Sequence, residues 1–171
     1  LTAGNSTPLT DGASCILLAS EEWAQEQGLP VLAYITFAEI AAIEYVKNQQ
    51  NLLLAPLFAA SRMLEKAELT LQDFDYYEIH EAFAAQTLAT LKIWESPELS
   101  AEIGLKKTLG AIDREKLNVK GSSLAAAHPF AATGGRIIGV MAKLLNEKGS
   151  GRGFISICAA GGQGVTMIIE K

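Results

Sequence analysis

The sequence predicts an α/β layered domain built on a mixed sheet. Short apolar and β-branched runs alternate along the chain with segments of helical periodicity. The chain closes on two strand-like runs joined by a glycine-rich stretch, which is typical of a hairpin. This order indicates helices layered on a sheet that has parallel and antiparallel pairs. The 171 residues, 49% of them hydrophobic, suffice for one domain with a real core.

Five short runs are rich enough in apolar side chains to form strands of this sheet. The first of them has the composition of a buried strand, and the last two are expected to pair across residues 159–164. The five runs are residues 14–18, 31–37, 74–79, 154–158 and 165–169.

Helices are expected between these runs. Ser20 is a candidate N-cap, followed by Glu21 and Glu22 in the first turn, with Gly28 as the stop. Residues 118–135 are rich in Gly, Ala and Ser and predict a long functional loop. Apolar spacing predicts further helices over residues 57–66, 81–94 and 98–107, and from Ile137 to Gly149.

The composition excludes some classes of function. A net charge of −5 and a pI of about 5.1 give no electrostatic footprint for nucleic acid. No apolar run approaches the roughly 20 residues of a membrane span, and no signal or leader pattern is present. Because the chain begins at Leu1, we expect it to be a processed product or an excised piece. The sparse cysteines, Cys15 and Cys158, indicate a reducing compartment and leave a bridge between them open.

Three residues at predicted strand ends carry the candidate chemistry. His80 follows one strand, His128 lies in the small-residue loop, and Cys158 meets the glycine-rich turn. Taken singly, each is more often structural, as a cap or a small buried hydrophobe. Together they supply a base, a thiol that free backbone amides could hold as a thiolate, and an oxyanion site, as acyl transfer requires. Zinc is disfavoured, because no two of them have close ligand spacing.

Four motifs follow one another along the chain. They are Thr2-Ala3-Gly4-Asn5 with Asp11-Gly12-Ala13, His80-Glu81-Ala82-Phe83, His128-Pro129 and Cys158. With these motifs in this order, the chain resembles the C-terminal half of a thiolase, an acyl-CoA acetyltransferase, over nearly its whole length. The His-Glu-Ala-Phe form of the second motif is similar to that of thiolases of fatty-acid β-oxidation complexes.

The resemblance implies a thiolase-like layered fold, with a mixed five-stranded sheet and helices on both faces. It implies that residues 1–171 are the C-terminal domain and that an N-terminal, nucleophile-bearing domain is absent. It also implies a coenzyme A thioester as substrate, no cofactor or metal, and a homo-oligomer at full length. The expected location is the cytoplasm, or the mitochondrial matrix in a eukaryote.

The family also implies a role for each matching residue. His128 would activate the nucleophilic cysteine and contribute to an oxyanion hole, and Cys158 would move the proton at the α-carbon of acetyl-CoA. His80 would help to hold a water or the thioester oxygen in the first oxyanion hole, and the backbone N–H of Ala160 would serve the second oxyanion hole. The positions that match the lining of the pantetheine channel are Ala3, Thr7 and Phe83.

Departures from the family pattern define the open alternatives. Ala127 and Ser122 stand where the family usually has glycine, and an added Cβ at Ala127 is unfavourable if that position needs a positive φ. Cys15 is expected to be a core thiol rather than the nucleophile, so the isolated chain should be inactive. The alternatives are a non-catalytic module that pairs with another subunit, or an α/β domain with idle motifs. Residues 49–60 are candidates either for the acyl channel or for the core.

Overall fold

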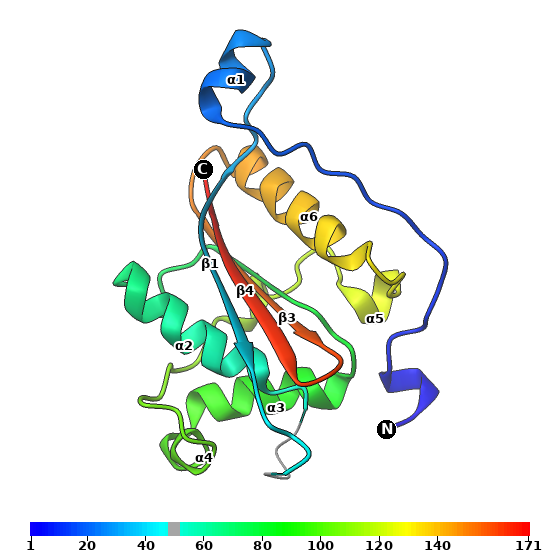
Figure 1. The fold of residues 1–171 in the computed structure, drawn as a ribbon, viewed down its shortest axis with the longest axis vertical. Helices are drawn as coiled ribbons and strands as arrows, with labels where there is room; N and C mark the ends of the chain where they lie inside the picture. Colours follow the sequence, from blue (N-terminus) through cyan, green and yellow to red (C-terminus); the bar gives the residue numbers. More distant parts are fainter. Residues whose placement is uncertain (48–51) are drawn as a thin grey trace.

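A computed structural model describes residues 1–47 and 52–171 of the chain (Figure 1). Within them the sheet has the strand order β1-β4-β3-β2. Strands β2 and β3 pair in parallel, whereas β4 pairs antiparallel with both β3 and β1. The predicted mixed sheet is thus confirmed. The strands are β1 (Tyr34–Ala42), β2 (Tyr76–Ile79), β3 (Arg152–Ala159) and β4 (Gln163–Glu170).

Helices cover both faces of the sheet, as expected. On one face, α2 and α3 enclose the larger core, and on the other α6 packs alone (Figure 1). Two single turns of 3-10 helix lie at Ala3–Asn5 and Arg114–Lys116. The α-helices are α1 (Glu21–Glu26), α2 (Ala55–Ala67), α3 (Ala84–Glu95), α4 (Pro97–Glu102), α5 (Ser123–Ala126) and α6 (Thr133–Lys148).

Alternation along the strands assigns side chains to the two cores. Phe154 on β3 faces α3, where its ring lies 5.8 Å from that of Trp94 in an edge-on arrangement. The next residue, Ile155, faces the opposite way and packs with Ile137 and Met141 of α6. Because successive side chains of a strand point to opposite faces, one strand contributes to both cores. The alternating side chains of β3 thus meet the apolar faces of the helices on both sides of the sheet.

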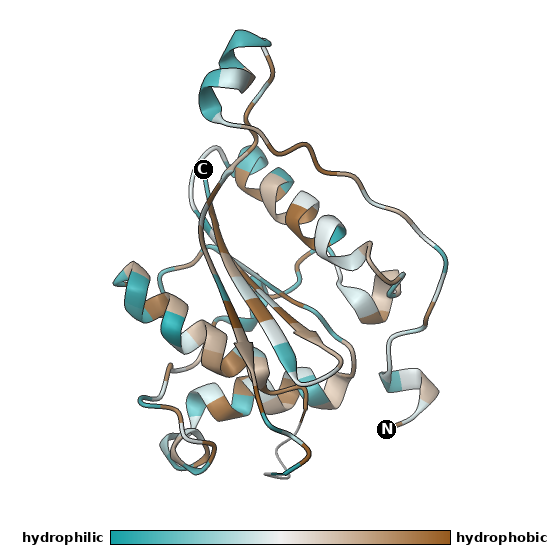
Figure 2. Cartoon of the chain, in the orientation of Figure 1, coloured by the Kyte–Doolittle hydropathy of each residue, from teal (hydrophilic) through white to brown (hydrophobic). Residues whose placement is uncertain are grey.

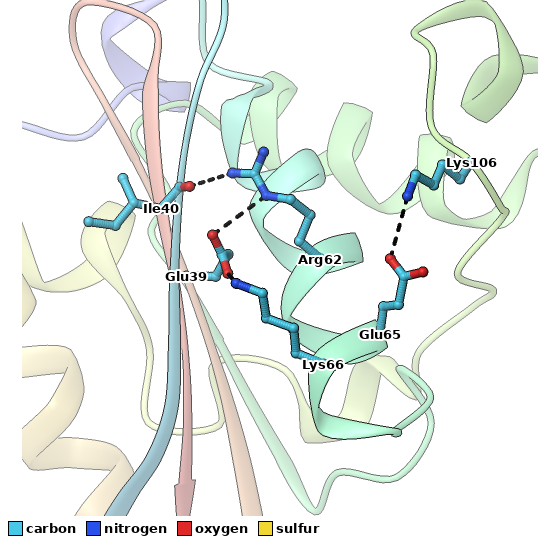
Figure 3. Close-up of polar contacts among 6 residues, drawn as sticks. All are labelled: Glu39, Ile40, Arg62, Glu65, Lys66 and Lys106. Atoms are coloured by element: carbon cyan, nitrogen blue, oxygen red, sulfur yellow. Dashed lines mark hydrogen bonds and ion pairs between the residues drawn. The ribbon is translucent and has the colours of Figure 1, made fainter.

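Polar contacts tie the edge strand β1 to α2 (Figure 3). Glu39 forms ion pairs with Lys66 and with Arg62, whose Nε lies 3.5 Å from the carboxylate. Arg62 also donates a hydrogen bond to the backbone carbonyl of Ile40. A weaker ion pair, 3.8 Å long, joins Glu65 to Lys106 on the outer side of α2. These contacts hold β1 in place at a sheet edge where most of its side chains are exposed.

The prediction of a fifth strand at residues 14–18 is wrong. The segment is extended but belongs to no sheet, and it passes along α6, where Ser14 Oγ donates to the carbonyl of Ala132 at 2.7 Å. Leu17 and Leu18 are 69% and 68% exposed. An apolar run predicts burial only if another surface covers it, and nothing in the described part of the chain covers this one. Figure 2 shows the hydrophobic colouring that continues along this segment and β1.

Two other boundaries differ from the predictions. Strand β1 begins at Tyr34, three residues later than expected. Its pairing with β4 runs from Tyr34 opposite Glu170 to Ala42 opposite Gln163. The helix expected over residues 98–107 ends at Glu102, and Gly104 follows with a φ of 85°. Within residues 1–47 and 52–171, no helix combines the length and apolar character that crossing a bilayer requires.

Candidate active site

The two histidines of the chain lie against each other, with ring centroids 4.4 Å apart. His80 directly follows β2, and its backbone N–H donates to the carbonyl of Ser156 on β3 at 2.9 Å. His128 lies between α5 and α6, and its N–H donates to the carbonyl of Pro8 at 3.0 Å. The phenyl ring of Phe130 stands edge-on to His128, with centroids 5.1 Å apart. The sequence prediction that both histidines share a site is consistent with this geometry.

Both imidazoles are neutral near neutral pH. Burial, together with the nearby His128 and the Arg136 cation, lowers the pKa of His80 to about 4. Burial and the Arg136 cation also lower the pKa of His128. A positive charge and a low-dielectric environment both disfavour a protonated ring. A neutral imidazole has one nitrogen that donates and one that accepts, so each ring can take part in proton transfer.

Cys158 lies near the end of β3, the strand that pairs with β2, which His80 directly follows. It follows Ser156 by two residues, so both side chains face the same side of the sheet. The side chain is buried, and burial raises the pKa of the thiol to about 11. The expectation of a thiolate stabilised here is therefore wrong for this chain. At neutral pH Cys158 carries its proton and can donate it.

Ala160 lies exposed in the turn between β3 and β4, two residues beyond Cys158. The turn closes through Gly161 and Gly162, whose φ angles of 84° and 73° suit glycine. On the other side of the hairpin, Cys158 pairs in register with Gly164. The turn thus keeps the backbone of Ala160 close to the thiol.

The N-terminal segment brings two of the expected channel residues together. Ser6 forms an isolated bridge with Phe83, and the N–H of Thr7 donates to the carbonyl of Ala82 at 3.0 Å. The hydroxyl of Thr7 donates to the carbonyl of Ser123 at 2.6 Å, so in this structure it joins the N-terminal segment to the start of α5. Ala3 lies in an exposed 3-10 turn before this contact.

Several residues of the site were not found by the sequence reasoning. Glu81 joins the loop after β2 to the loop before α5, because it accepts from Asn118 Nδ2 at 2.8 Å and from the N–H of Leu124 at 3.0 Å. Ser123 and Arg136 lie beside His80 and in contact with each other. The hydrogen bonds of Ser123 and Arg136 join residues more than ten positions apart, so no local pattern of the sequence indicates them. Of these residues, Glu81 could have been found from the sequence, because it lies inside the His-Glu-Ala-Phe motif.

A buried carboxyl also lies near this site. Glu78 is 1% exposed and neither of its carboxyl oxygens has a hydrogen-bond partner within the described residues. Burial raises its pKa to about 7, although the Arg136 cation opposes this shift. The side chain therefore takes up a proton in the pH range in which His80 stays neutral.

These two groups give opposite pH dependences of stability. Below pH 6.5 the unfolded chain protonates His80, whereas the folded chain does so only near pH 4, so stability falls as the pH falls. Glu78 binds its proton near pH 7 when folded and near 4.5 when unfolded, so its contribution rises as the pH falls. We expect Glu78→Gln to lose about 2 kcal/mol of unfolding free energy between pH 6.5 and 4.5, more than the wild type. Urea unfolding at several pH values measures how the unfolding free energy of the variant and of the wild type changes with pH.

The reciprocal variant is the control for this expectation. His80→Gln removes the destabilising proton uptake of the unfolded state and leaves the Glu78 contribution. Relative to the wild type, its stability should rise as the pH falls over the same window. Parallel slopes in the wild type and both variants would contradict the assignment.

Ala127 occupies a backbone conformation that favours glycine. Its φ of 70° and ψ of −177° lie in a region that is essentially restricted to glycine, and such residues cost about 1–3 kcal/mol. The concern about a positive φ at Ala127 is therefore confirmed. Ser122, by contrast, has a negative φ and donates to the carbonyl of Ile79 at 3.2 Å. The second departure from the glycine pattern is accommodated without backbone strain.

Ala127→Gly should stabilise the chain by about 1 kcal/mol, since relief of strain exceeds the extra entropy that glycine loses on folding. Thermal or urea unfolding measures the change. Ala126→Gly is the matched control, because Ala126 lies in the helical conformation of α5 and its replacement should destabilise by about 1 kcal/mol. Equal effects at the two positions would show that Ala127 is not strained.

Cys15 is not the core thiol that was expected. It is exposed and lines an apolar cleft of about 630 Å³ between the N-terminal segment and α6. Both cysteines are free, so the bridge left open by the sequence is not formed. Of the candidate channel residues 49–60, residues 49–51 lie outside the described part of the chain. Leu57 is fully buried in the core, which favours the core alternative for that residue.

Comparison with known proteins decides the family of this domain. The family described as thiolase, C-terminal domain, matches residues 30–171. The chain belongs to the thiolase family. A 3-ketoacyl-CoA thiolase of Alteromonas mediterranea is 47% identical over 99% of this chain, and one of Aeromonas salmonicida is 46% identical over the same share. The chain spans 38% of the length of each of these relatives.

Solved thiolase structures share the fold. The acetyl-CoA acetyltransferase of Bacillus anthracis superposes with a TM-score of 0.78, at 38% identity over 99% of this chain and 38% of its own. Human mitochondrial 3-ketoacyl-CoA thiolase superposes with a TM-score of 0.74, at 28% identity over the whole of this chain and 38% of its own. The layered α/β fold expected from the resemblance is thereby confirmed, with four strands described instead of five.

Proposed function

We propose that this thiolase domain forms the C-terminal part of a 3-ketoacyl-CoA thiolase that cleaves 3-ketoacyl-CoA with coenzyme A. The observation that supports the proposal best is the pair of neutral histidines in contact, His80 and His128, beside the strand that bears Cys158. A base, an oxygen-binding donor and a protonated thiol are the groups that breaking a carbon–carbon bond next to a thioester requires. The names of the bacterial relatives agree with this reaction.

Each residue has a role in the proposed reaction. His128 takes the proton of a nucleophilic cysteine supplied from outside this chain, and the thiolate attacks the 3-keto carbon. The carbon–carbon bond breaks, and its electron pair forms the enolate of acetyl-CoA. The acyl group stays on the nucleophilic cysteine as a thioester until the thiol of coenzyme A attacks it, takes the acyl group and releases that cysteine. Cys158 gives its proton to the α-carbon of that enolate, and His80 and the N–H of Ala160 donate to the oxygens that gain charge. The protonated state of Cys158 suits this cleavage direction.

The remaining parts of the proposal concern partners. Because the chain spans 38% of its relatives, the nucleophile, the coenzyme A site and the homo-oligomer are proposed for the longer protein. Ala3, Thr7 and Phe83 are proposed to line the pantetheine channel, with Phe83 beside the Thr7 segment. The exposed apolar side chains of residues 14–18 and β1 are proposed to pack against the missing domain. A cytoplasmic location is proposed because these relatives come from bacteria.

A chimera tests this function. The 171-residue chain alone should release no acetyl-CoA from acetoacetyl-CoA and coenzyme A, because it lacks the nucleophile. Joined to the amino-terminal part of the Alteromonas mediterranea relative, it should regain cleavage. The intact relative serves as the positive control for the assay. Activity of the isolated chain, or a folded but inactive chimera, would contradict the proposal.

A non-catalytic assembly module is the second candidate, and the strained Ala127 favours it. The Cβ at this position lies next to His128 in the loop that would meet the thioester. An inactive chimera that regains cleavage with Ala127→Gly would favour drift from catalysis. A chimera that is active with Ala127 in place would argue against it.

A further inference from the structure

A chain of hydrogen bonds runs from α6 to the buried nitrogen of His80. Arg136, in the first turns of α6, donates from Nη2 to Ser123 Oγ at 2.9 Å. Ser123 Oγ lies 2.7 Å from His80 Nδ1. Ser123 is 0% exposed and His80 is 2% exposed, so water does not compete for these bonds. The proton positions in this chain follow from the number of donors that each group has.

Arginine has donors and no acceptor, so Ser123 Oγ accepts the bond from Arg136. The hydroxyl then has one proton left to donate, and among the described residues His80 Nδ1 is the partner within reach. If Nδ1 carried the ring proton instead, the buried hydroxyl proton would have no acceptor. Nδ1 of His80 is therefore the accepting nitrogen, and the ring proton lies on Nε2.

The opposite arrangement holds at His128. Its Nδ1 lies 2.6 Å from Thr133 Oγ1, and that hydroxyl donates to the carbonyl of Pro129 at 3.3 Å. A hydroxyl has only one proton to donate, so Thr133 must accept from His128 Nδ1–H. The ring proton of His128 therefore lies on Nδ1, and Nε2 has a free lone pair. One ring presents a donor and its neighbour presents an acceptor.

We propose that Ser123 with Arg136, and Thr133 with Pro129, are positioning residues that hold His80 and His128 in opposite tautomers. His80 is kept as an Nε2–H donor for a thioester oxygen, and His128 is kept as an Nε2 base for the thiol of the nucleophile. The tautomers are a property of this chain, whereas their use in cleavage rests on the proposed function. The two rings cannot exchange these starting roles, because Nε2–H of His80 cannot take a proton and Nε2 of His128 cannot donate until it has taken one.

The charges around the pair support neutral rings. His80 faces His128 and the Arg136 cation, and His128 faces the same cation. The buried carboxyl of Glu78 lies within the electrostatic range of Arg136. The other nearby carboxylate, Glu81, is engaged by Asn118 and by the N–H of Leu124. Arg136 thus both polarises Ser123 and disfavours protonation of either ring.

The test uses nitrogen-15 NMR of the histidine side chains, which is direct because this chain has only two histidines. At neutral pH we expect one ring protonated at Nε2 and the other at Nδ1. Ser123→Ala should move the Nδ1 resonance of His80 toward that of an unbonded acceptor and raise the pKa of His80. Thr133→Val should instead shift His128 from the Nδ1–H to the Nε2–H tautomer. Each variant serves as the control for the other ring.

Several outcomes would overturn the proposal. Two rings in the same tautomer in the wild type would do so without any variant, which covers the case in which a variant fails to fold. A His80 resonance that is unaffected by Ser123→Ala would also do so. The NMR test needs no catalytic turnover, so the tautomer proposal and the proposed function can fail independently. The expected tautomers together with an inactive, folded chimera would disprove the function but not the positioning roles.

Discussion

Cys158→Ala in the chimera should lower cleavage of acetoacetyl-CoA by about 10²- to 10⁴-fold, the range that a positioned acid or base contributes. The thiol of Cys158 is buried, and its pKa of about 11 keeps it protonated at neutral pH. Without it, the enolate left after bond cleavage has no proton donor at the α-carbon. We expect the loss mainly in kcat, because the missing proton transfer belongs to the chemical step rather than to binding. Steady-state thiolysis at saturating coenzyme A measures it.

The chain offers a matched control for this substitution. Cys15→Ala makes the same chemical change at a cysteine that has no role in the proposed reaction and is exposed in the chain alone, and its activity should equal that of the parent chimera. The unfolding free energy of both variants shows whether removal of the buried sulfur alone unfolds the domain. Unchanged turnover in a folded Cys158→Ala variant would refute the role of this residue.

Gly164→Ala should destabilise the chain by about 3 kcal/mol, at the upper end of the usual range for overpacking. A Cβ at Gly164 would overlap the backbone nitrogen of Pro56 and lie 2.7 Å from the carbonyl carbon of Ala55. Because these are backbone atoms at the start of α2, no rotation of a side chain relieves the contact. Gly164 is also the register partner of Cys158, so the strain falls on the strand pair that bears the thiol.

Gly139→Ala is the control for Gly164→Ala. Gly139 lies inside α6, where nothing approaches the position of an added Cβ within 4 Å. Alanine should stabilise that helix by up to about 1 kcal/mol. Urea unfolding should show changes of opposite sign in the unfolding free energy of the two variants, relative to the wild type. A neutral Gly164→Ala would mean that α2 and β4 do not pack as closely as described.

The local patterns of the sequence predicted the elements that depend on neighbouring residues. Ser20 caps α1, and its side chain accepts from the N–H of Trp23. Gly149 ends α6 in the left-handed conformation, at the position where the sequence predicts the end of this helix. The helix over residues 57–66 and the terminal hairpin were also predicted, because capping, periodicity and turn chemistry act within a few residues.

The failures share a different cause. Residues 14–18 and Cys15 look buried by composition, but burial depends on a covering surface that local pattern does not encode. The ionisation of Cys158 was misjudged for the same reason. Free amides near a thiol favour the thiolate, yet burial in the fold outweighs them and raises the pKa. The depth of a side chain is a property of the packed molecule.

By itself, the sequence determined the family and the α/β layering, and it pointed to His80, His128 and Cys158 as candidate chemical groups. Only the tertiary structure decided how these side chains are arranged. It placed the two imidazoles 4.4 Å apart and gave each ring a different hydroxyl partner, from Ser123 and from Thr133. Residue types fix which protons are available, but where each proton lies depends on partners brought together across the fold.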